Sequence, residues 1–87
     1  MKTIKTFEEA KGKLRYELFA EKTDNTEHYG ISVTSSIFGE PETASVSDIT
    51  TEAEFAEKMF RMIADNFVLP STFSEVVEEL VSAELTV

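Results

Sequence analysis

The chain has 87 residues, no cysteine and a formal net charge of −9. A chain of this length folds as one domain, here residues 1–87, whose thin core leaves little room for a deep, substrate-sized cavity. The missing cysteines exclude disulfides, thiolate metal sites and cysteine nucleophiles, and no apolar run comes near the roughly 20 residues that cross a bilayer.

The acidic charge is concentrated after residue 20. Residues 1–20 carry a balance of +2, whereas residues 21–50 carry −5 and residues 51–87 carry −6. Most of the chain would therefore repel phosphate backbones and anionic lipids, so we expect no nucleic-acid partner and no membrane partner. A small secreted domain often needs disulfides, so their absence favours the cytoplasm. The N-terminal residues also lack the apolar segment of a signal peptide. We interpret the basic residues of the first part as solvated strand faces (Lys2, Lys5, Lys11, Lys13 and Arg15).

Up to about residue 50, apolar residues alternate with a period of two, which predicts strands between about residues 3 and 49. A first short strand over residues 4–9 is followed by a turn at Lys11 and Gly12. Two clearly alternating strands, residues 13–21 and 28–36, form a hairpin around the polar turn at residues 23–26. Their inward faces carry Leu14, Tyr16, Leu18 and Ala20 on the first strand and Tyr29, Ile31 and Val33 on the second. After a turn at residues 38–42, the strand over 43–49 carries Ala44 and Val46 on one face and Ile49 on the other.

After residue 50 the apolar period lengthens to about 3.6, which predicts two helices, over about residues 52–66 and 73–83. Thr51 with Glu54, and Thr72 with Glu75, match capping boxes, so each threonine is expected to cap the helix that follows it. Because the strands precede the helices, the sequence predicts an α+β fold. We expect an antiparallel meander of three or four strands followed by two helices packed on one face.

No pattern in the sequence assembles an active site. His28 is the single histidine, and we expect it to be an exposed residue where a turn meets a strand. No serine lies in a nucleophile elbow, and the three glycines are too scattered for a phosphate-binding loop. The acidic residues of the helices fall opposite the apolar stripes and are expected to be solvated. We therefore predict that the chain is not an enzyme and holds no metal or other cofactor.

Several large apolar residues fall outside the predicted core faces. Two helices on one face leave the other face of the sheet open, and we expect Phe19 and Ile49 to point to that open side. Ile37 and Phe38 lie at the neighbouring turn. Apolar patches of this kind often mark contacts with a partner. We therefore name Phe19, Ile37, Phe38 and Ile49 as the predicted apolar surface, a candidate for interaction.

Four short motifs occur in order along residues 14–81. They are Tyr29–Gly30–Ile31 in a strand, Val46–Ser47–Asp48–Ile49 before the first helix, Asn66–Phe67–Val68–Leu69–Pro70 between the helices, and residues 73–80. The set resembles a domain-of-unknown-function family of small uncharacterised proteins from clostridia-like Gram-positive bacteria. The resemblance implies a bacterial, cytoplasmic protein of unknown role, and it transfers no catalytic or ligand residue.

Three functions stay open at this point. The first is a small non-enzymatic domain that binds another protein or itself, for example as a homodimer. The second is an acidic mimic or regulator that binds a basic protein partner through the Glu-rich helix faces. The third is a small ligand-binding domain or enzyme, with polar groups gathered around His28, Tyr16 or Tyr29.

Overall fold

The computed structural model describes residues 2–85, in which four strands precede two helices. The strands are β1 (Lys2–Glu9), β2 (Leu14–Thr23), β3 (Thr26–Ser35) and β4 (Glu42–Thr50), and the helices are α1 (Ala53–Asp65) and α2 (Pro70–Leu85). The strands form one antiparallel sheet in the order β1-β2-β3-β4. The predicted α+β meander is confirmed, with the fourth strand present.

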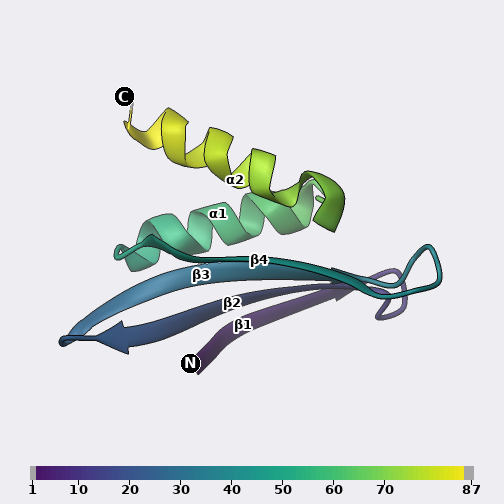
Figure 1. Cartoon of the computed structure of the whole chain (residues 1–87), viewed down its shortest axis with the longest axis horizontal. Coiled ribbons are helices and arrows are strands. Elements are labelled where there is room, and N and C mark those ends of the chain that lie inside the picture. Colours follow the sequence, from purple (N-terminus) through teal and green to yellow (C-terminus); the bar gives the residue numbers. More distant parts are fainter. Residues whose placement is uncertain (1, 86–87) are drawn as a thin grey trace.

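Both helices lie on the same side of the sheet (Figure 1). α1 packs against β2, β3 and β4, whereas α2 runs back in the opposite direction and lies mainly over β4. The residues that the two periodicities place inward form the core between these layers. The sheet contributes Leu14, Tyr16, Leu18, Ala20, Tyr29, Ile31 and Val33, and the helices contribute Ala56, Met59, Phe60, Ile63, Ala64, Phe73 and Val77.

The β2–β3 hairpin fixes the register of the sheet. Its strands pair without a break from Leu14 opposite Ser35 to Thr23 opposite Thr26. The two residues of the turn, at positions 24 and 25, have φ values of 50° and 65°. An Asp-Asn pair tolerates this left-handed backbone, and the resulting turn matches the twist of the two strands.

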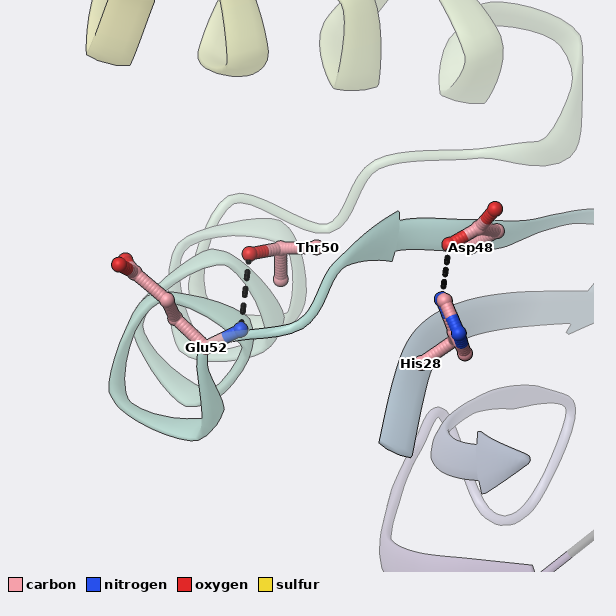
Figure 2. A network of polar contacts seen from close by, with 4 residues as sticks. All are labelled: His28, Asp48, Thr50 and Glu52. Atoms are coloured by element: carbon pink, nitrogen blue, oxygen red, sulfur yellow. Dashed lines mark hydrogen bonds and ion pairs between the residues drawn. The ribbon is translucent and has the colours of Figure 1, made fainter. Parts of the chain in front are cut away.

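Neither helix begins as its capping box predicted. At α1 the N-cap residue is Glu52, which makes no side-chain capping bond, and its backbone N–H donates instead to Thr50 Oγ1 (3.1 Å; Figure 2). At α2 the first helical residue is Pro70, so Thr72 lies inside the first turn. Proline suits this position because its φ is already helical and its missing N–H would be unsatisfied there. The predicted capping roles of Thr51 and Thr72 are therefore wrong.

A bulge interrupts β4. The β4 partners of Tyr29 and Ile31 lie at positions 50 and 46, four residues apart instead of two. Asp48, inside the bulge, has a φ of 54°, a left-handed conformation that aspartate tolerates better than most residues. The extra residues return Ile49 to the helix side, where it packs against the core. The prediction that Ile49 points to the open face is wrong because the bulge breaks the alternation.

α1 ends in a Schellman motif that contains no glycine. The N–H groups of Phe67 and Val68 donate to the carbonyls of Ala64 and Ile63 at 3.2 and 3.3 Å. Val68 and Ile63 both belong to the core. Phe67 adopts a φ of 52° and is 56 % exposed, so a bulky side chain occupies the position that glycine usually fills. This reversal directs α2 back along the sheet.

Candidate functional site

The sheet face away from the helices is polar. It carries an ion pair between Arg15 Nε and Glu17 Oε1 (3.5 Å) and a hydrogen bond between the hydroxyls of Thr34 and Thr43 (3.2 Å). An ion pair and hydroxyl contacts of this kind are compatible with a solvated face. The expected apolar patch is therefore not found among the side chains described on this face.

Phe19 points to the polar face but is only 7 % exposed. Its cross-strand partner is Gly30, and a Cβ built on Gly30 would lie 2.5 Å from Phe19 Cζ. The missing side chain of Gly30 thus lets the ring pack down on the sheet. The prediction that Phe19 is an exposed contact residue is wrong, because alternation along one strand does not show what lies on the next.

Ile37 and Phe38 lie in the loop between β3 and β4 and are 40 % and 80 % exposed. The loop is tied to the β1–β2 turn by a hydrogen bond from the Ser36 N–H to the Lys13 carbonyl (2.8 Å). It projects past the end of the sheet, away from the helices (Figure 1). The four residues of the predicted apolar surface therefore do not form one surface. For Ile37 and Phe38, a role in an interaction remains a prediction.

A shallow groove lies between β4 and α2, where the sheet ends. We call it the β4–α2 groove; its volume is about 390 Å³, and it is lined by Val46, Asp48, Ile49, Val77, Glu78, Val81 and Ser82. Its floor is aliphatic: Val77 is 4 % exposed, and the other three aliphatic side chains are half-buried against the core. Its rim carries the exposed carboxylates of Asp48 and Glu78.

β4 is a terminal strand of the sheet. Among residues 2–85, no strand pairs with its outer side, so that side has backbone N–H and C=O groups available for pairing. The β4–α2 groove therefore combines three features in one place: an unpaired strand edge, an aliphatic floor and an acidic rim.

Asp48 belongs to two surfaces, because the bulge lies at the border between them. On the helix side it lines the β4–α2 groove. On the polar side it lines a depression of about 200 Å³ together with Phe19, Glu21, Thr23, His28 and Ser47. His28 Nδ1 lies 2.6 Å from Asp48 Oδ1, and Figure 2 shows the ring reaching from β3 to the bulge. An ionised carboxylate only accepts hydrogen bonds, so Nδ1–H is the donor.

His28 differs from its prediction. It lies within β3 and its side chain is 28 % exposed, so it is not an exposed turn residue. In many active sites with a nucleophile, an aspartate orients the histidine that acts as the general base. In the part of the chain that the structure describes, however, no hydroxyl is hydrogen-bonded to the His28 ring. The pair therefore links β3 to the bulge in β4.

Tyr16 and Tyr29 do not gather around His28, because both point to the helix side of the sheet. The Tyr16 hydroxyl donates to the Val68 carbonyl inside the core (2.9 Å), and burial raises the pKa of Tyr16 to about 12. The Tyr29 hydroxyl donates to Glu27 Oε2 (3.0 Å), and this hydrogen bond raises the pKa of Tyr29. The polar cluster expected for a ligand-binding site or an enzyme is therefore not formed by these three residues.

Two other features bear on function in residues 2–85: the arrangement of possible metal ligands and the apolar character of the helices. No group of three or more His, Asp or Glu side chains is arranged to hold a metal ion. No helix in this range has the length and the apolar composition needed to cross a membrane. The outer face of α2, by contrast, carries Glu75, Glu78 and Glu79 side by side along an open hollow.

Sequence reasoning missed the β4–α2 groove, although it identified its parts. It placed Val46, Val77 and Val81 on inward-facing patterns, which is correct. The incomplete cover over them depends on how α2 is placed over β4, and periodicity carries no information on that placement. The signal that was available is Asp48, a charged residue directly before Ile49 in a strand that alternates apolar and polar residues up to Val46.

A family model described as "Family of unknown function (DUF6514)" matches residues 1–83. No curated protein and no solved structure gives a significant match to the chain.

Proposed function

Since the chain belongs to DUF6514, a family of unknown function, we propose its role from its own surfaces. We propose that it is a non-enzymatic protein-binding domain whose β4–α2 groove receives an extended, basic and apolar segment of a partner protein. The observation that carries this proposal is the joint presence of an unpaired strand edge, an aliphatic floor and an acidic rim.

A segment that adds to an open sheet edge gains affinity from main-chain hydrogen bonds and specificity from the pockets for its alternate side chains. In the β4–α2 groove, aliphatic side chains of the segment would contact Val46, Val77 and Val81. Lysine or arginine side chains would pair with Asp48 and Glu78 on the rim. The groove therefore favours a segment that carries both apolar and basic residues on the strand face that points towards α2.

Charge supports a basic partner over an acidic one. The net charge of −9 and the glutamates along α2 would attract a basic segment and repel an acidic one. This unites the first two functions left open by the sequence, because the groove that receives the segment has Glu78 of the acidic α2 face on its rim. A bacterial source, a cytoplasmic location and the lack of a nucleic-acid partner are parts of the same proposal.

The non-enzymatic part of the proposal is supported by the surroundings of His28. The ring is bonded to Asp48, and the two tyrosines are engaged on the other side of the sheet. The depression beside His28 is about half the size of the groove, at about 200 against about 390 Å³.

The test is the affinity of the chain, measured by fluorescence anisotropy, for a capped, labelled lysine–valine peptide of seven residues. Threonine occupies every second position of this peptide, so that its lysines and valines share one strand face. We expect binding that weakens as salt is added, since exposed charges are screened beyond about 8 Å at physiological ionic strength. We expect no binding of the matched glutamate–valine peptide.

Two variants locate the binding on α2. Glu78→Lys changes the rim of the groove and should weaken binding about tenfold, or about 1.4 kcal/mol. Glu75→Lys makes the same charge change on the same exposed helix face but outside the groove, so its affinity for the peptide should fall much less. Equal losses in the two variants would mean that the peptide responds to net charge alone, and would contradict docking in the groove.

A further inference from the structure

The two edges of the sheet differ in chemistry. β1, at the opposite edge from β4, exposes seven of its eight residues. Lys2, Lys5 and Phe7 of β1 pair with β2 residues that point into the core, so these three side chains lie on the helix side. Lys5 Nζ lies 3.3 Å from Glu57 Oε1 of α1, which confirms that the Lys5 side chain is on the helix side. β1 therefore carries basic groups on the same side as the groove.

β1 also exposes apolar side chains. Ile4 is 39 % exposed and Phe7 is 36 % exposed, with the Phe7 ring 6.4 Å from that of Tyr16. On its helix side, β1 thus combines two lysines, Lys2 and Lys5, with the ring of Phe7. This is the chemistry that the β4–α2 groove favours.

We infer that the segment bound in the β4–α2 groove is β1 of a second copy of this chain, an inference that rests on the proposed function and names its partner. The acidic rim at one edge of the sheet and the lysines at the other are complementary within one molecule. The partner strand does not have to be supplied by a different protein.

The topology allows this pairing without rearrangement. Four antiparallel strands in sequence order leave β1 and β4 running in opposite directions at the two edges. A second copy that adds its β1 to β4 continues the antiparallel alternation and keeps its helices on the same side. In that arrangement the added β1, seven of whose eight residues are exposed, lies beside the β4–α2 groove.

The bulges limit the length and the register of the contact. The regular segments are Lys5–Glu9 in β1 and Glu42–Val46 in β4. Setting Phe7 opposite Val46 brings Lys5 towards the rim of the groove, where Asp48 and Glu78 lie, and places Glu9 opposite Ala44. Short paired segments and a charge of −9 on each copy oppose tight binding, so the association is weak and reversible.

The contact is heterologous, because it joins two different edges. Each copy in a pair keeps one unused edge, so association continues beyond the dimer into short chains or a ring. An interface between two identical edges would stop at the dimer.

The experiment is sedimentation velocity with light scattering on the whole chain, at about 0.15 M salt and up to about 1 mM protein. We expect a mass that rises with concentration from 9.8 kDa to beyond twice that value. Lys5→Glu and Glu78→Lys should each weaken association about tenfold. The double variant Lys5→Glu/Glu78→Lys should associate more strongly than either single variant, because the two exchanged charges attract each other again across the rim, although Asp48 still opposes the new glutamate. Lys58→Glu/Glu75→Lys, an exchange at exposed sites away from both edges, is the control.

A chain that stays monomeric over this range would overturn the inference. So would a dimer that does not grow, or one that Lys5→Glu leaves unchanged. None of these results contradicts the proposed function, which the peptide titration tests separately. Circular dichroism of each variant shows whether a loss of association reflects a loss of fold.

Discussion

At the scale of single residues, two aromatic side chains lie in environments with a definite energetic consequence. Tyr16 carries a hydroxyl into the core and bonds it to the carbonyl of Val68, between the two helices. Phe67 holds a left-handed backbone at the end of α1. Tyr16 thus links the sheet to the helix pair, and Phe67 makes the reversal between the helices at the cost of local strain.

Replacing Tyr16 by phenylalanine should lower the free energy of unfolding by about 1–3 kcal/mol at pH 7, because the Val68 carbonyl loses its buried partner. The pKa of Tyr16 rises from 10.0 to about 12 on folding, so the unfolded chain ionises first. The contribution of the neutral hydroxyl is therefore complete below pH 10 and is lost as the pH rises towards 12.

The difference in unfolding free energy between the original chain and Tyr16→Phe should consequently shrink above pH 10. Urea titrations at pH 7, 9, 10 and 11 follow this difference directly. A difference that stays constant over the series would contradict the buried, neutral state of Tyr16.

Replacing Phe67 by glycine should raise the free energy of unfolding by about 1 kcal/mol, because glycine adopts a positive φ without strain. The side chain is 56 % exposed, so little buried area is lost. Arg61→Gly, at an exposed position inside α1, should instead lower the free energy of unfolding by about 1 kcal/mol. Thermal and urea unfolding compare the two. A loss of stability in Phe67→Gly would mean that the ring contributes packing that outweighs the strain.

At the scale of elements, the sheet depends on a pair of residues that face away from the helices. Gly30 and Phe19 are cross-strand partners, and the ring takes the space that a side chain on Gly30 would occupy. This covers the glycine and removes an aromatic side chain from solvent. The polar face therefore stays free of an apolar patch even though it includes a phenylalanine.

Gly30→Ala should destabilise the chain by about 1–3 kcal/mol through overpacking. The added Cβ would lie 2.5 Å from Phe19 Cζ and 2.7 Å from the Val46 carbonyl oxygen, so the backbone has to shift. Ser32→Ala, on the same face of the same strand, is the matched control and should change stability little. Urea unfolding of both variants gives the comparison, and a loss below about 0.5 kcal/mol in Gly30→Ala would contradict the close packing.

The elements that the sequence predicted correctly are those set by periodicity. Leu14, Tyr16 and Leu18 on β2, and Met59 and Ile63 on α1, repeat at strand and helix spacing and lie in the core. The position of each of these residues in its periodic pattern is enough to predict that it is buried, so no knowledge of neighbouring elements was needed.

The wrong predictions have two causes: local backbone geometry, and contacts with residues on neighbouring strands. Pro70 starts α2 earlier than the capping box indicated, and the bulge at Asp48 reverses the orientation of Ile49. Phe19 is buried by a glycine eleven residues later in the chain. The candidate groove depends on the placement of α2 over β4, which no local pattern records.

At the scale of the whole molecule, charge and shape are both asymmetric. The acidic residues lie after residue 20 and include the rim of the β4–α2 groove, whereas β1 carries lysines at the other edge. The helices cover the sheet unevenly, so the two edges are left with different apolar surfaces. Function is therefore expected at the edges of the sheet and not in an enclosed pocket.

The most direct test of this account is a two-dimensional NMR titration of the ¹⁵N-labelled chain with the lysine–valine peptide, which reports on each backbone amide. The account predicts that the largest shifts fall on residues 44–49 and 77–82, on both sides of the groove. Amides of the polar sheet face and of the loop that carries Ile37 and Phe38 should change little. Shifts centred on that loop or on the polar face, or the absence of any shift, would contradict the proposal that the β4–α2 groove is the binding site.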